Sequence, residues 1–238
     1  MISPAMRSVT AVFLAVLASG ACSSAARQTE RGVPSPEGSE PGQSERRAIA
    51  EARADSIRYP YTEADIRFMT GMIGHHAQAI TMSRWAATHG ASAAVQTLAG
   101  RIINGQKDEI NTMQRWLRYR LQPVPEPHVA GKGMTMHGGD HAMLMPGMLT
   151  GAQMNELDAA RGREFDRLFL IFMIQHHGGA VEMVKDLFAS RGAAQDETVF
   201  KFASDVNVDQ STEIDRMQKM LAALMFGPPG DQTAVENP

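Results

Sequence analysis

The sequence contains a single cysteine, Cys22, among 238 residues, and this scarcity excludes an intramolecular disulfide framework. Aromatic residues make up only 6% of the chain, and the formal net charge of -3 is close to balance. A chain without a basic excess lacks the electrostatic footprint of a nucleic-acid-binding protein. We therefore expect no nucleic-acid partner.

Motifs of several enzyme and metal-site classes are also missing. No histidine has glutamate three residues before it, so the Glu-x-x-His pairs of ferritin-like di-iron sites are absent. His-Glu-x-x-His, a phosphate-binding glycine loop and Gly-x-Ser-x-Gly do not occur either. The motifs therefore favour a protein that is not an enzyme.

The N-terminus is typical of an exported protein. Arg7 precedes an apolar run from Val9 to Leu17, and small residues follow up to Cys22. This pattern predicts a signal peptide over residues 1–21, with Cys22 as a lipidation site. We expect a protein of the cell envelope or periplasm, anchored to the outer membrane through lipid alone, with simple secretion as the alternative.

Composition divides the remaining chain into three parts. Residues 22–58 are rich in Ser, Pro, Gly, Glu and Arg, which predicts a disordered tether. A helix over 44–58 is the alternative for its last part, although its apolar face would be thin. Apolar residues at helical spacing occupy 59–226 and predict a helical bundle, and residues 227–238 form a polar tail. Within the bundle we expect four helices, over about 60–88, 92–121, 150–190 and 197–225.

The two halves of the bundle repeat one another. Eight residues recur after 101 positions: Asp65, Phe68, Met72, Ile73, His75, His76, Ala79 and Met82 match Asp166, Phe169, Met173, Ile174, His176, His177, Ala180 and Met183. Repeat one spans 59–122, a connector spans 123–152, and repeat two spans 153–226. One helical hairpin cannot bury its own apolar stripe, so the duplication predicts an all-α, four-helix bundle made of two repeated hairpins.

Each repeat carries a His-His pair with methionine three residues before the first histidine. At about 100° per residue, His76 and His177 fall near the centres of the apolar stripes, whereas His75 and His176 fall at their edges. A buried imidazole needs a partner, because an unpaired polar group destabilises a fold by about 1–3 kcal/mol. That partner is a metal ion or a carboxylate; the nearby carboxylates are Asp65, Glu109, Asp166 and Glu213.

The connector is unusually rich in methionine. Five methionines and two histidines lie within the 15 residues 134–148: Met134, Met136, His137, His141, Met143, Met145 and Met148. Core packing explains them poorly, because glycine-rich irregular segments run over the surface. Thioether ligands favour a soft ion, so copper as Cu(I) is the expected cofactor and zinc is a weaker candidate. The alternative is a linker without metal.

The doubled motif Phe68-Met69-x-x-Met72-Ile73-x-His75-His76-x-x-Ala79-Ile80-x-Met82 resembles a secreted bacterial family, "domain of unknown function 305". The resemblance implies a ferritin-like bundle, and some members of the family bind copper. The metal ligands that it implies are Met69, Met72, His75, His76, Met173, His176 and His177. Leu170 stands where repeat one has Met69, so the second site is expected to be weaker.

Three functions follow from these observations. We expect a metal-binding protein of the envelope that buffers copper or confers tolerance to it, with the metal ion as its partner and its protein partners unknown. An oxidoreductase or electron-transfer protein that uses the same sites is the first alternative. A structural bundle, in which the histidines form internal hydrogen-bond networks without metal, is the second.

Overall fold

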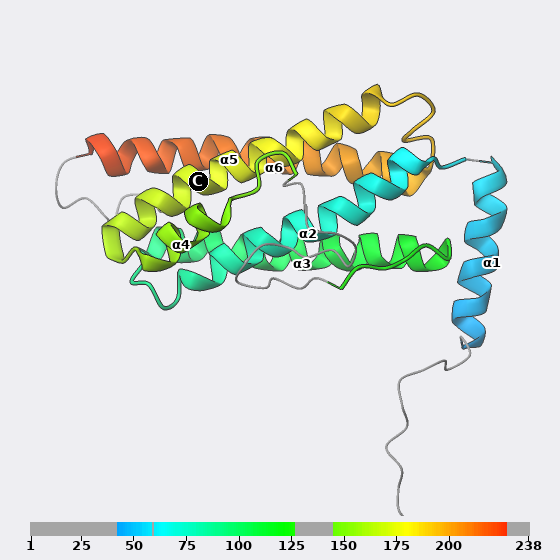
Figure 1. The fold of residues 1–238 in the computed structure, drawn as a ribbon, viewed down its shortest axis with the longest axis horizontal. Helices are drawn as coiled ribbons and strands as arrows, with labels where there is room; N and C mark the ends of the chain where they lie inside the picture. Colours follow the sequence, from blue (N-terminus) through cyan, green and yellow to red (C-terminus); the bar gives the residue numbers. More distant parts are fainter. Residues whose placement is uncertain (1–41, 59, 127–144, 228–238) are drawn as a thin grey trace, which may run out of the picture. The chain divides into compact units, whose positions relative to one another are not determined.

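The computed structural model describes residues 42–58, 60–126 and 145–227, which contain six α-helices and no β-strand (Figure 1). The helices are α1 (Gln43–Arg58), α2 (Glu63–Trp85), α3 (Ala93–Tyr119), α4 (Gly151–Ala159), α5 (Gly162–Ala189) and α6 (Glu197–Phe226). The prediction of an all-α protein is therefore confirmed for this part of the chain.

Helices from the same sequence repeat pack against each other. In repeat one α2 lies along α3, and in repeat two α5 lies along α6. The two pairs meet where α2 contacts α5, while α4 contacts both of these helices and α1 contacts α3. The interface between the repeats is thus made mainly by the two helices that carry the His-His pairs.

Local sequence determines where two of these helices begin. Thr62 caps α2 in a capping box with Asp65, whose carboxylate accepts a hydrogen bond from the Thr62 N–H at 2.6 Å. Thr150 and Gln153 form the same arrangement before α4, as their spacing predicts. In each box the side chains bond main-chain N–H groups that have no partner inside the helix.

Asp65 and its repeat counterpart Asp166 also connect the two helix pairs. Asp65 Oδ1 accepts a hydrogen bond from the N–H of Ala194, in the turn between α5 and α6, at 2.7 Å. Asp166 accepts one from the N–H of Ser92, the residue that caps α3, at 3.2 Å. Each repeat therefore fixes the turn of the other.

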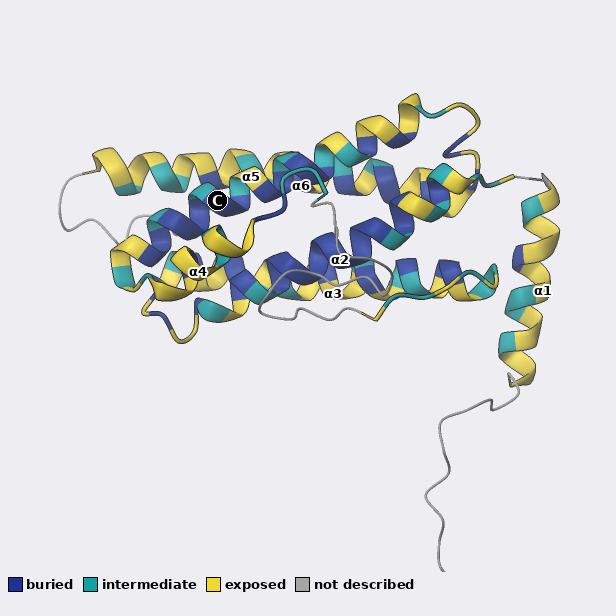
Figure 2. Ribbon diagram, viewed as in Figure 1, coloured by how far each residue is buried: buried dark blue, intermediate teal, exposed yellow. Residues whose placement is uncertain are grey.

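Buried residues line the faces that the long helices turn toward one another (Figure 2). The apolar ones form two clusters, and the four histidines belong to neither. One cluster joins the first half of α2 to the second half of α5, through residues such as Met72 and Val184. The other joins the second half of α2 to the first half of α5, through residues such as Met82 and Phe169. Since the histidines lie midway along both helices, they form a polar layer between the clusters.

One expectation needs correction, and one alternative left open by the sequence is observed. The helix expected over 150–190 is two helices, because the backbone is extended at Ala160 and Arg161 and Gly162 adopts a positive φ of 57°. Residues 43–58, the last part of the predicted tether, form α1, whose Ala-, Glu- and Arg-rich sequence has high helix propensity. An ion pair one helical turn apart, Arg47–Glu51, supports this helix.

The remaining boundaries stay predictions. The signal peptide, Cys22 and residues 228–238 of the tail lie outside the described residues, as does the connector from 127 to 144. None of the helices that the structure describes has the combination of length and apolar composition that a membrane span requires.

Candidate metal centre

The histidine layer consists of His75 and His76 on α2 and His176 and His177 on α5, and all four are 0% exposed. They lie one turn after Met72 and Met173, and consecutive residues on a helix point about 100° apart. The two members of a pair therefore face different neighbours. His75 and His176 turn toward the contact between α2 and α5, whereas His76 and His177 turn toward α3 and α6.

His75 and His176 are in direct contact across the two repeats. Their ring centroids lie 3.8 Å apart, with an angle of 40° between the ring planes. The distances within each sequence pair are longer, 6.4 Å for His75–His76 and 6.3 Å for His176–His177. The closest imidazoles therefore come from different repeats, and sequence adjacency does not identify them.

His76 and His177 each approach a carboxylate. His76 Nε2 lies 2.6 Å from Glu109 Oε2, and His177 Nε2 lies 2.6 Å from Glu213 Oε2. The second contact has hydrogen-bond geometry, whereas the atoms of the first are close but not aligned for a hydrogen bond. Glu109 and Glu213 are thus the carboxylate partners of the histidines; Asp65 and Asp166 bind main-chain N–H groups instead.

Several imidazole nitrogens in the layer are buried without a hydrogen-bond partner among the described residues. They include the Nδ1 atom of all four histidines and the Nε2 atom of His176. Buried polar atoms are usually paired, and each unpaired one destabilises a fold by about 1–3 kcal/mol. This group of lone pairs can accept a metal ion.

Burial keeps the contacting histidines neutral. Desolvation, with a smaller repulsive effect of His76, lowers the pKa of His75 to about 3. Desolvation and the proximity of His75 lower the pKa of His176 well below its ordinary value. A neutral imidazole has a lone pair on one nitrogen, which is the form that ligates metals.

Thioethers flank the layer. The predicted ligands Met69, Met72 and Met173 are fully buried; Met69 and Met72 lie in one apolar cluster and Met173 in the other. Their burial is equally compatible with ordinary core packing. Met145 and Met148 are the predicted connector ligands that the structure describes, and Met148 is buried. Met134, Met136, His137, His141 and Met143 lie outside the described residues.

The residues that we singled out from the sequence omit two buried positions on α3 and α6. Gln106 and Gln210 are almost fully buried, and each has an amide atom without a hydrogen-bond partner among the described residues. Each lies one turn before the glutamate that contacts a histidine. They recur after 104 residues, together with Glu109 and Glu213, so the repeat was a signal that could have identified them.

No three His, Cys, Asp or Glu side chains within 42–58, 60–126 and 145–227 are arranged to hold a metal ion together. The layer instead offers a contacting pair of imidazoles with methionines one turn away. This is a mixed nitrogen and sulfur donor set.

The two lowered pKa values predict that the metal-free protein loses stability as the pH falls. Unfolded histidine protonates near pH 6.5, so the unfolded chain binds more protons than the folded chain between about pH 6.5 and 3. The free energy of unfolding should fall in this window, by about 1 kcal/mol per pH unit for each such histidine. Urea unfolding at pH 7, 6 and 5 measures this free energy, which should change less with pH in the H75L/H176L variant than in wild type. The same pH dependence in both proteins would contradict the prediction.

The chain is similar to solved structures with the same helical fold. A Streptomyces coelicolor DUF305 protein, described as a candidate secreted protein, is 28% identical, with a TM-score of 0.57; the match covers 68% of this chain and 94% of that one. CopM in its Cu(II)-bound form is 30% identical, with a TM-score of 0.51, and covers 66% of this chain and 95% of CopM. Its Cu(I)-bound form is 27% identical, with the same TM-score.

A curated relative and the family match complete the comparison. The uncharacterised protein L153 of Acanthamoeba polyphaga mimivirus is 41% identical over 56 residues, or 24% of this chain. The chain matches only 37% of the length of that relative. The family described as "Domain of unknown function (DUF305)" matches residues 65–221, which include both His-His pairs, all of α3 and α5 and most of α2 and α6. The chain belongs to this family.

Proposed function

We propose that this protein binds copper in the cell envelope and buffers it or confers tolerance to it. The observation that carries the proposal is the contact between His75 and His176, which buries unpartnered imidazole nitrogens between two apolar clusters. Such an arrangement is unfavourable without a ligand, because nothing among the described residues satisfies these nitrogens. A metal ion would satisfy them without adding a buried polar group.

The donor set favours copper over zinc. Imidazole suits Zn, Cu, Fe and Ni, whereas a thioether such as that of Met72 or Met173 selects a soft ion such as Cu(I). The proposed ligands in the described residues are Met69, Met72, His75, His76, Met173, His176 and His177, with Met145 and Met148 from the connector. CopM, a similar protein, has structures with Cu(II) and with Cu(I) bound, and this supports copper as the cargo.

Glu109 and Glu213 are the proposed carboxylate partners of two ligating histidines, His76 and His177. A ligating histidine usually donates its second ring N–H to a carboxylate or carbonyl, which fixes its orientation and raises its basicity. His76 and His177 place Nε2 against these carboxylates and leave Nδ1 free. In this proposal the four long helices act as a ferritin-like, four-helix bundle of two hairpins, with the site at the interface of the repeats.

Replacing the four histidines of the layer by leucine should abolish tight Cu(I) binding while the helical fold persists. Leucine removes every imidazole lone pair but keeps the layer filled and apolar. Competition with a chromophoric Cu(I) chelator measures the affinity, and circular dichroism measures the helix content. The matched control is H89L, which removes a buried histidine outside the layer. Unchanged Cu(I) affinity in the fourfold variant would refute the proposal.

We propose a second, auxiliary Cu(I) site in the connector, formed by Met134, Met136, His137, His141, Met143, Met145 and Met148. Five of these seven lie within 131–144, and that segment can be replaced by a Gly-Ser bridge without changing Met145 or Met148. The bridged protein should bind less Cu(I) per chain but nearly as much Zn(II), because thioethers are poor zinc ligands. Metal analysis after dialysis measures both. Equal Cu(I) content in the two proteins would make the connector a linker only.

The proposed location follows from the N-terminal signal and agrees with the candidate secreted protein of Streptomyces coelicolor. We propose that Cys22 is acylated and that the mature chain is anchored to the outer membrane by this lipid. Cys22→Ala should move the protein from the membrane fraction to the soluble fraction or block its processing. Fractionation and mass spectrometry test this; wild-type protein that is fully soluble and has no lipid mass would contradict it.

A further inference from the structure

Residues 145–149, which we call the strap, lie across the histidine layer on one side. The Pro146 carbonyl lies 3.0 Å from His75 Nε2. Gln78, three residues after His75 on α2, makes two hydrogen bonds with the main chain of Leu149, at 3.0 and 2.7 Å. Gln175 on α5 donates to the Gly147 carbonyl at 3.2 Å. Side chains from both repeats therefore hold this short segment in place.

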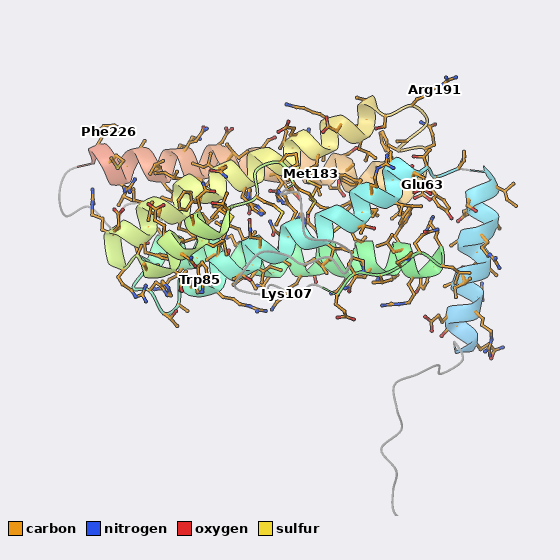
Figure 3. The ribbon with its side chains drawn as sticks, viewed as in Figure 1. Glu63, Trp85, Lys107, Met183, Arg191 and Phe226 are labelled. Atoms are coloured by element: carbon orange, nitrogen blue, oxygen red, sulfur yellow. The ribbon has the colours of Figure 1, made fainter. Side chains whose placement is uncertain are left out.

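Glycines make room for the strap. A Cβ at Gly179 would lie 1.9 Å from the Pro146 carbonyl oxygen, a distance that no side chain permits. Gly147 has a φ of +75°, and a Cβ there would lie 2.6 Å from the Gln175 carbonyl oxygen. On α2, a Cβ at Gly71 would lie 2.8 Å from Met145 Sδ. Met183, labelled in Figure 3, lies beside the same position, with its methyl carbon 3.6 Å away.

The strap contacts positions at which the two sequence repeats differ. Positions 101 residues apart carry matching residues at Met72/Met173, His75/His176 and His76/His177. The positions that hold or accommodate the strap do not match: Gly71/Phe172, Gly74/Gln175 and Gln78/Gly179. The duplicated helices thus share the histidine layer, and their differences adapt one side of it to this segment.

The strap determines which nitrogen of His75 carries hydrogen. A carbonyl oxygen only accepts hydrogen bonds, so His75 Nε2 must donate to Pro146. In the neutral ring, the lone pair is then on Nδ1, which is buried and has no hydrogen-bond partner among the described residues. His176, in contact with this ring, has no hydrogen bond on either nitrogen from the described residues. Of the two contacting imidazoles, the strap orients only one.

We propose that the strap positions His75 to bind the metal through Nδ1 and that Gln78 is a positioning residue of the site. This inference rests on the proposed copper site. The Pro146 carbonyl does for His75 what the Glu213 carboxylate does for His177: it accepts the second ring N–H. Loss of such an outer partner weakens metal binding by about 10–100-fold in known sites.

The test uses two variants that displace the strap and one matched control. Gln78→Ala removes both hydrogen bonds to Leu149, and Gly179→Ala places a Cβ against Pro146. Gly178→Ala is the control, because an added Cβ at the adjacent position meets nothing within 4 Å. Both substitutions replace glycine by alanine inside α5 and raise helix propensity equally, so the two variants differ only in their effect on the strap. Gln78→Ala keeps the test valid if Gly179→Ala does not fold.

Two readouts separate this inference from the copper proposal. In metal-free protein with ¹⁵N-labelled histidine, NMR should show His75 protonated at Nε2 in wild type and Gly178→Ala, and a mixture of tautomers in the strap variants. Cu(I) affinity should fall about 10–100-fold in the strap variants only. If the folded strap variants keep the His75 tautomer of wild type and bind Cu(I) as tightly as wild type, this inference is overturned and the copper proposal stands. A wild-type protein that does not bind Cu(I) would overturn the copper proposal and this inference with it.

Discussion

The burial of four imidazoles at the middle of α2 and α5 is the constraint on which the rest of the structure depends. An apolar core would be more stable with aliphatic side chains there, because each imidazole has one nitrogen or more without a hydrogen-bond partner among the described residues. The fold supports this layer with a large apolar cluster on each side of it. It also supplies three outer acceptors, namely Glu109, Glu213 and the Pro146 carbonyl.

The ends of the helix pairs are fixed by different means from the middle. Asp65 and Asp166, which the sequence repeat marks as equivalent, hold the turn of the opposite pair through main-chain N–H groups. At the far end of α3, Arg120 and Trp116 both bind the Asp196 carboxylate that caps α6. Polar contacts with well-defined partners thus fix the ends of the helix pairs, whereas several nitrogens of the polar layer at the centre have no partner among the described residues.

Much of this could be predicted from the sequence, because the signals were local or repeated. Helical spacing predicted the four long helices, and the capping boxes at Thr62 and Thr150 are local features that fix two helix starts. The break before Gly162 was missed, since it depends on a positive φ and on a hydrogen bond from Gly162 N–H to the His89 carbonyl. Periodicity separated the faces of His75 and His76, but it could not show that His75 contacts His176, because that contact depends on how the repeats pack.

The strap occurs once, although the helix pairs and the His-His pairs on either side of it occur twice. Two separate copies of a single helix pair could associate into a symmetric dimer with the same histidine layer, but neither copy would have a segment that joins it to the other. In a single chain, the segment between the two helix pairs supplies the strap. Gln78 and Gly179 occupy equivalent positions of the two pairs, but Gln78 binds the strap, whereas Gly179 leaves room for it. The layer is therefore asymmetric, because the strap lies against one side of it, and a symmetric homodimer of a single helix pair cannot have this asymmetry.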